Sequence, residues 1–137
     1  HTRGLEVVAQ WQVRRDWRLE GSYSLLDSSF NVPAGSRDSG IGQFVDHQVQ
    51  LHSRVDVTDR VEWDADLYWV DDMEPAGFDA YTRFDMRVGW RPRPGVELSL
   101  AGKNLLDPQH PELFSSDHGV DALEVPRSVQ AKVTVEW

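Results

Sequence analysis

The chain has 137 residues, a formal net charge of −9 and no cysteine. This length is compatible with one domain, the negative charge argues against a nucleic-acid partner, and the lack of cysteine excludes disulfides and thiolate metal sites. No apolar run approaches the ~20 residues of a membrane helix, so a helical membrane protein is excluded. A β-barrel is not excluded, because its alternating strands leave only a weak hydropathy signal.

Apolar and polar residues alternate with a two-residue period along most of the chain, which predicts β-strands. In one segment Val61, Trp63 and Ala65 alternate with Glu62 and Asp64. Seven such segments are predicted, at residues 5–13, 17–25, 47–57, 61–69, 80–90, 96–105 and 128–137. Each has about ten residues, the length that a tilted strand needs to cross a bilayer.

The connections between these segments alternate in length. Residues 14–16, 58–60 and 92–95 are short turns, whereas residues 27–46, 71–79 and 106–127 are longer loops. Tight turns on one side and longer loops on the other are typical of an up-and-down barrel. We therefore predict an all-β fold of antiparallel, transmembrane barrel strands.

All six tryptophans fall on the apolar face of their predicted strands, and five lie beside a short turn or at the chain end. These five are Trp11, Trp17, Trp63, Trp90 and Trp137. An aromatic ring prefers the headgroup level of a membrane, so we expect them to form a girdle at one interface. The alternative is a soluble sandwich or calycin-like binding module, in which large aromatics would occupy the strand centres. Those centres carry smaller groups such as Ala9, Ala65, Leu51 and Ala131.

The last third of the chain carries the most specific sequence signals. Residues 80–92, AYTRFDMRVGWRP, resemble the penultimate hairpin of the TonB-dependent outer-membrane receptor family. The run Gly102-Lys103-Asn104-Leu105-Leu106-Asp107 is similar to its G-x-N-L-[LF]-D strand end. The final strand, entered from Val125-Pro126-Arg127 and ending on an aromatic residue, fits as well.

This resemblance implies a barrel of about 22 strands with a plugged lumen, of which residues 1–137 would be the C-terminal portion. It also implies a receptor in the Gram-negative outer membrane that takes up a scarce nutrient, with a ferric siderophore as the expected cargo. The implied partners are membrane lipid, the rest of the barrel and its plug, the TonB complex and the barrel-assembly machinery. Neither a plug nor a TonB box is present, and His1 is neither an initiator methionine nor part of a signal peptide, so we expect a segment of a longer protein or a trimmed mature domain.

The C-terminal strand carries a second implied signal. Val133, Val135 and Trp137 alternate up to the aromatic last residue. In the family such an end looks like the signal read by the barrel-assembly machinery. Trp137 is also compatible with a role as one more girdle residue.

Candidate catalytic and metal-binding residues are sparse. His110, Asp117, His118 and Asp121 share one long connection, so a metal site there is conceivable, and Ser115-Ser116-Asp117-His118 holds hydroxyl, carboxylate and imidazole groups. Adjacent residues rarely reach triad geometry, which distant segments normally assemble. We predict no enzyme, no cofactor and no metal site. The charged residues of the polar face are expected to form cross-strand ion pairs or to line a lumen, with Asp64 and Asp66 as a weak candidate for a cationic group.

Overall fold

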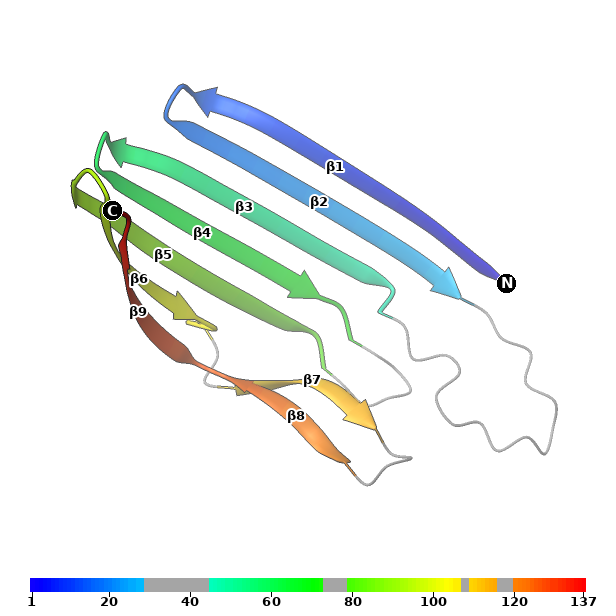
Figure 1. Cartoon of the computed structure of the whole chain (residues 1–137). Coiled ribbons are helices and arrows are strands. Elements are labelled where there is room, and N and C mark those ends of the chain that lie inside the picture. Colours follow the sequence, from blue (N-terminus) through cyan, green and yellow to red (C-terminus); the bar gives the residue numbers. More distant parts are fainter. Residues whose placement is uncertain (29–44, 73–78, 107–108, 116–119) are drawn as a thin grey trace.

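The structure is a computed structural model, and it describes residues 1–28, 45–72, 79–106, 109–115 and 120–137. This part of the chain forms nine β-strands (Figure 1). They are β1 (Thr2–Arg14), β2 (Trp17–Ser28), β3 (His47–Thr58), β4 (Val61–Val70), β5 (Tyr81–Arg93), β6 (Val96–Lys103), β7 (Gln109–Ser115), β8 (Val120–Pro126) and β9 (Ser128–Val135). Among these residues, no helix is long and apolar enough to cross a membrane.

Seven of the strands form one antiparallel sheet in the order β1-β2-β3-β4-β5-β6-β9. Each strand pairs with its sequence neighbour, except that β9 joins β6 after the chain has passed through β7 and β8. The all-β prediction of seven antiparallel strands is confirmed. Since side chains directly opposite in an antiparallel pair share a face, the register carries the two-residue alternation across the whole sheet.

Three tight turns join the hairpins, at Arg15–Asp16, Asp59–Arg60 and Pro94–Gly95. The short connections predicted from the sequence are confirmed. In all three hairpins the register shifts within the last few residues before the turn, at Gln12/Arg14, Asp56/Thr58 and Trp90/Arg93. Such bulges increase the local twist of a strand pair. They therefore help to bend the sheet at one end.

One predicted loop contains a second sheet. Residues 106–127 were expected to be a loop, but β7 and β8 form an antiparallel hairpin there. The expectation was wrong because the alternation is broken in both strands: Pro111 interrupts β7, and Ala122 stands next to Leu123 in β8. The pairing itself shifts register at Pro111/Leu113 and at Leu113/Ser115. A prediction that relies on the two-residue alternation of apolar and polar residues therefore misses this hairpin.

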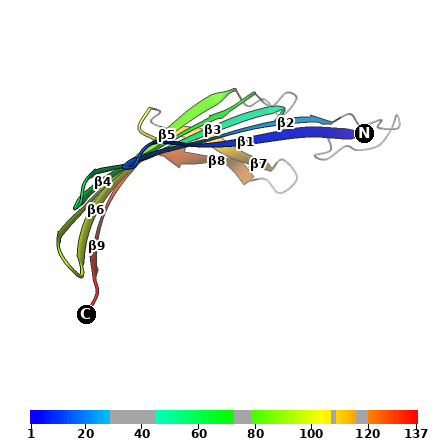
Figure 2. The same cartoon turned by 90° about the horizontal axis from the view of Figure 1, so that it is seen from above.

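The seven-stranded sheet is an open, curved wall (Figure 2). Its curvature is that of a section of a cylinder, and the C-terminus lies at one end of the arc. In the described part of the chain β1 and β9 each pair on one side only. Both therefore present an unpaired strand edge, which native sheets normally cover or close.

The apolar side chains of the wall enclose no core. Among the described residues no hydrophobic side chain is buried, and Leu5, Trp11, Leu100 and Val133 are all more than half exposed. A soluble sandwich or calycin-like barrel would converge such side chains into an enclosed interior. Proteins rarely expose an apolar surface of this extent to water, so we expect lipid or another protein surface to cover it.

The turn between β5 and β6 depends on Gly95. Arg93 pairs with Val96 around Pro94 and Gly95, and Gly95 has φ = 75°, which suits glycine after a proline in a tight turn. A Cβ on Gly95 would lie 2.6 Å from the carbonyl oxygen of Glu136, and the Glu136 N–H donates to the Gly95 carbonyl at 2.8 Å. The turn thus accommodates the end of the terminal strand.

We expect Gly95→Ala to lower the free energy of unfolding by about 1–3 kcal/mol, because it combines a strained φ with a backbone clash. The measurement is urea unfolding of the complete protein in lipid vesicles. The matched control is Gly21→Ala, since a Cβ there would meet its nearest neighbour at 3.7 Å. Equal stability of the two variants would show that the turn does not require glycine.

Candidate functional site

The polar face of the sheet holds its charged side chains, and the register orders them into rows across the strands. One row runs Arg18–Arg54–Asp64–Arg87 from β2 to β5. The next row, farther from the tight turns, runs Glu20–His52–Asp66–Asp85. The predicted cross-strand arrangement of these charges is therefore present. It also places two arginines, and two aspartates, directly opposite each other, which is unfavourable without further partners.

Arg87 is the centre of an ion-pair cluster on β4, β5 and β6. Its guanidinium donates to the carboxylates of Glu62, Asp64 and Glu97, with Nη1 to Asp64 Oδ2 at 3.0 Å and Nη2 to Glu97 Oε1 at 2.5 Å. Arg91 bridges the outer two carboxylates, with Nη2 to Glu62 at 2.6 Å and Nε to Glu97 at 3.2 Å. We call these five residues the Arg87 cluster. Its forked, charge-assisted hydrogen bonds fix three neighbouring strands to one another.

A glycine makes room for this cluster. Gly89 is buried and lies opposite Glu62 on the polar face. A Cβ at this position would meet Glu62 Oε1 at 2.8 Å and Arg87 Nη2 at 3.1 Å. The glycine is therefore required by side chains that pass over it rather than by its backbone conformation.

A second group of polar contacts lies farther from the tight turns. His52 Nδ1 and Asp66 Oδ1 are 2.6 Å apart, and the His52 ring meets the Tyr68 ring edge-on at 5.6 Å. The Arg83 guanidinium lies 4.4 Å above the Tyr68 ring and also contacts Asp85 at 3.2 Å. Asp64 and Asp66, the weak candidate for a cationic group, thus already have partners within the sheet: Arg87 and His52, respectively.

Asn104 anchors the end of β6. It is fully buried and adopts a positive φ of 53°, which asparagine tolerates better than most residues. Its backbone N–H donates to Asp85 Oδ1 at 2.9 Å, and its Nδ2 donates to the Val125 carbonyl at 2.9 Å. The next N–H, of Leu105, donates to the Phe84 carbonyl at 2.8 Å. Asn104 therefore joins β6 to β5 and β8.

The neighbouring glycine of the same motif is explained by packing. A Cβ on Gly102 would lie 2.8 Å from Leu105 Cδ2. Leu105 folds back over Gly102 as the chain turns at Asn104. The Gly102–Leu106 run thus forms a structural anchor, and this role was not predicted from the sequence.

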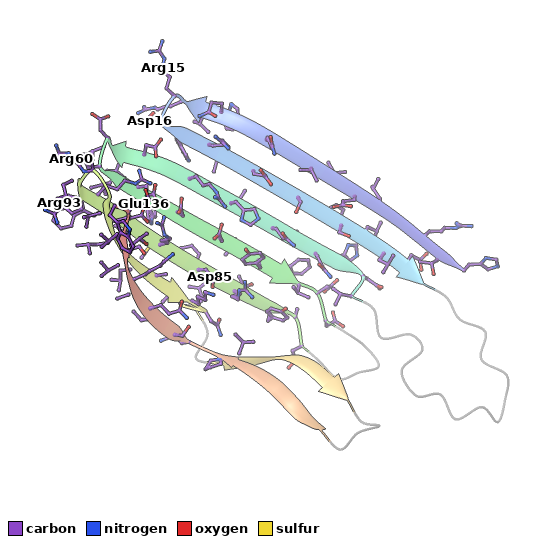
Figure 3. All side chains as sticks on the ribbon, viewed as in Figure 1. Arg15, Asp16, Arg60, Asp85, Arg93 and Glu136 are labelled. Carbon is purple, nitrogen blue, oxygen red and sulfur yellow. The ribbon has the colours of Figure 1, made fainter. Side chains whose placement is uncertain are left out.

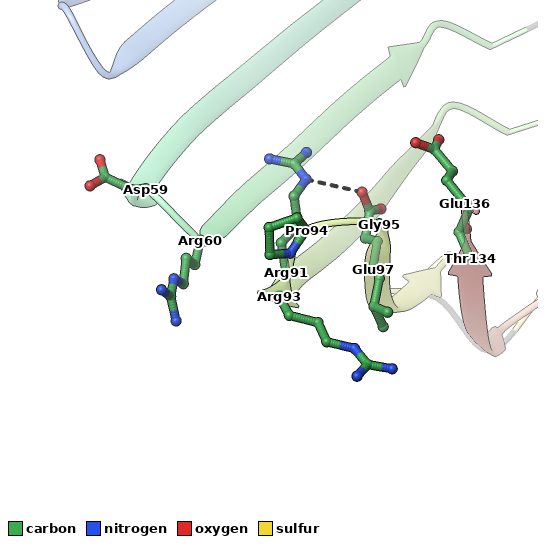
Figure 4. A pocket seen from close by; sticks show the side chains of 10 residues that line it. Asp59, Arg60, Arg91, Arg93, Pro94, Gly95, Glu97, Thr134 and Glu136 are labelled. Carbon is green, nitrogen blue, oxygen red and sulfur yellow. Dashed lines mark hydrogen bonds and ion pairs between the residues drawn. The ribbon is translucent and has the colours of Figure 1, made fainter.

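A cleft of about 370 Å³ opens at the tight-turn end of the sheet (Figure 4). Arg91 and Glu97 of the Arg87 cluster contribute to its wall, together with Arg60, Arg93 and Glu136. Figure 3 places Arg15, Arg60 and Arg93 at this same end of the sheet. Its charges are mixed, and its arginine–carboxylate contacts suit water and ions better than an apolar ligand.

Four of the five predicted girdle residues lie on the apolar face, and the fifth, Trp137, follows the end of β9. Trp17 and Trp63 both stand opposite Val55, whereas Trp90 pairs with Val61 and Trp11 with Leu19. Trp11, Trp63, Trp90 and Trp137 are exposed, and the partly exposed Trp17 donates from Nε1 to Ser53 Oγ at 3.1 Å. Their common height in a membrane remains a prediction. The same holds for an assembly role of Val133, Val135 and Trp137, although both valines are exposed on the edge strand β9.

The conceivable metal and triad residues fall outside what the structure describes. Asp117 and His118 are not described, and neither are the side chains of His110, Ser115 and Asp121. Among the described residues, no group of three or more His, Asp or Glu side chains could hold a metal ion. His47 and His52 face opposite sides of β3: His47 Nδ1 lies 2.7 Å from Tyr23 Oη on the apolar face, and His52 contacts Asp66 on the polar face.

Comparison with known proteins gives one family. The family model described as "TonB dependent receptor-like, beta-barrel" matches residues 1–105. No curated protein matches the chain. The matched residues include β1 to β6, and hence the whole Arg87 cluster and Asn104.

We expect Arg87→Gln to lower the free energy of unfolding by about 1–3 kcal/mol, because it leaves three neighbouring carboxylates without their shared cation. Arg54→Gln is the matched control, since Arg54 lies in the same row of the same face and forms no ion pair with any described residue. That change should alter stability by less than about 0.5 kcal/mol. Urea unfolding in vesicles compares the two, and equal losses would mean that the Arg87 cluster does not hold the wall together.

Proposed function

Since the chain belongs to the TonB-dependent receptor-like β-barrel family, we propose that it forms the C-terminal part of the wall of an energised uptake receptor, with a ferric siderophore as cargo. The family is one of outer-membrane receptors and transporters and not of enzymes, and its members work with TonB. Within such a receptor, residues 1–137 contribute barrel wall and connecting segments. Coupling to TonB would belong to a plug and a TonB box, which residues 1–137 are not proposed to supply.

The observation that carries this proposal is the uncovered apolar face. Strands β1 to β5 have ten to thirteen residues each, enough for tilted strands to cross a bilayer. Their apolar side chains share one face, with none buried among the described residues, while their charged side chains contact one another on the opposite face. Lipid outside and water inside satisfy both faces.

The open edges support a larger barrel. A strand edge in a bilayer leaves N–H and C=O groups that lipid cannot satisfy, so the wall must continue beyond β1 and β9. Seven strands would also be too few to leave interior room, since about eight already give an interior filled by side chains. The partner of β9 in the closed barrel is the first strand of the receptor's N-terminal part.

The tryptophans and the terminal strand fit the same arrangement. Trp11, Trp17, Trp63, Trp90 and Trp137 would lie at the membrane interface on the side of the tight turns. In this arrangement the tight turns face the periplasm, as in other bacterial barrels. Val133, Val135 and Trp137 on the edge strand would be read by the barrel-assembly machinery before the barrel closes.

Uptake of labelled iron tests this proposal in cells. A strain that lacks the complete receptor gene should fail to take up iron from its ferric siderophore, and the plasmid-borne gene should restore uptake only when the energy-transducing complex is intact. The protein should fractionate with the outer membrane and require detergent for extraction. Restored uptake without that complex, or a protein recovered in the soluble periplasmic fraction, would refute the proposal. Uptake of another nutrient in its place would refute the siderophore assignment alone.

A further inference from the structure

Arg18 and Arg54 stand directly opposite each other on the polar face of β2 and β3. Directly opposed residues of an antiparallel pair have their Cβ atoms only about 4.5–5.5 Å apart. Two like charges in this position repel, and both side chains are exposed. The pair is therefore unfavourable unless something between the two guanidinium groups carries negative charge.

Within the described residues, neither Arg18 nor Arg54 takes part in an ion pair. The other arginines in the body of the polar face do: Arg83 contacts Asp85, and Arg87 and Arg91 belong to the Arg87 cluster. Two of the neighbouring carboxylates already have partners, whereas a third, Asp56, lines an adjoining hollow together with both arginines. Glu20 accepts a hydrogen bond from Gln10 Nε2 at 2.9 Å, and Asp64 accepts one from Arg87 at 3.0 Å.

The two arginines open onto a cleft of about 260 Å³, whose other walls are Glu20 and His52. This volume is ample for an oxyanion with its hydration water. A guanidinium presents a planar fork of N–H donors that matches a carboxylate or a phosphate in two parallel hydrogen bonds. Two facing forks can therefore hold one such group from both sides.

We propose that Arg18 and Arg54 form an oxyanion subsite on the inner wall of the barrel, which takes a carboxylate or phosphate group of a small anionic ligand. The proposal rests on the receptor function, because only a barrel places this face on the inside, away from lipid. Arg18 follows the Arg15–Asp16 turn and Arg54 precedes the Asp59–Arg60 turn, so the subsite lies towards the tight-turn end of the wall. It therefore meets an anionic cargo late in its passage rather than at the outer mouth.

The charges around the subsite limit its strength. Glu20 lines the same cleft, and Asp64 and Arg87 follow in the row beyond Arg54. These carboxylates, and Asp56 on the same strand as Arg54, offset much of the positive charge of the two arginines. Weak binding that a passing ligand can leave is the expected consequence, with an affinity that falls as salt rises.

Titration of the complete receptor with inorganic phosphate at low salt, followed by isothermal calorimetry in detergent, tests the subsite. Wild-type protein should bind phosphate saturably. Arg18→Gln or Arg54→Gln should weaken binding at least about tenfold, since each removes one of two charged forks, and the double variant should abolish it. Arg83→Gln is the matched control on the same face and should stay within about twofold, because Arg83 already contacts Asp85.

If the loss of positive charge in the Gln variants disturbs assembly, the Arg18→Lys/Arg54→Lys variant provides a second test. It retains both charges without the forks and should bind more weakly than wild type but more tightly than the double Gln variant. The subsite proposal would be overturned if the wild type showed no saturable phosphate binding. This includes the case in which a carboxylate of the receptor itself already binds the two arginines. A double variant that binds as tightly as wild type would also overturn it. Iron uptake by the same wild-type protein reports separately on the receptor function.

Discussion

Two opposite faces on every strand, imposed by the two-residue period of extended backbone, are the constraint on which this structure depends. An antiparallel ladder propagates that period from strand to strand, so a single register makes one whole surface apolar and the other polar. The described residues show the result: no hydrophobic side chain is buried, and the charged side chains of β4 to β6 form ion pairs with one another. A sheet with such faces is stable only between two different solvents. The proposed barrel would supply them, with lipid on one side and a polar interior on the other.

The polar face deals with its charges in two different ways. On β4 to β6, two arginines and three carboxylates satisfy one another, and Gly89 keeps the space that they need. On β2 and β3, two arginines are aligned with no carboxylate between them. The first arrangement holds neighbouring strands together. In the second, the two guanidinium groups form no ion pair within the described residues. Both arrangements follow from the register, which places residues of neighbouring strands opposite one another.

The strands and their facing could be read from the sequence because alternation is a local signal. The predicted segments 47–57 and 61–69 differ from β3 and β4 by only one residue at the C-terminal end. The tight turns could also be predicted, from the short connections between the predicted strands and from the Pro94-Gly95 pair. The β7–β8 hairpin was not, because Pro111 and the Ala122-Leu123 pair break the period.

The side-chain contacts of the candidate site could not be predicted from the two-residue alternation of the sequence. The charged residues of the Arg87 cluster could be assigned to one face, but which carboxylates reach Arg87 depends on the β4–β5 register and, for Glu97, on the bulge at Trp90/Arg93 between β5 and β6. Asn104 was recognisable only as part of a family motif. Its role in tying β6 to β5 and β8 emerges from the positive φ and from hydrogen bonds to Asp85 and Val125.

Spin-label accessibility along the strands tests the two-solvent assignment most directly, and residues 1–137 hold no native cysteine that would compete for the label. Labels would be placed by cysteine substitution at Leu51, Leu100 and Ala131 on the apolar face, and at the adjacent Gln50, Ser99 and Gln130 on the polar face, in the complete receptor reconstituted in vesicles. Labels on the apolar face should collide with dissolved oxygen and be shielded from a water-soluble nickel chelate, and labels on the polar face should show the reverse. Equal access of the nickel chelate to both faces would contradict a membrane-spanning wall.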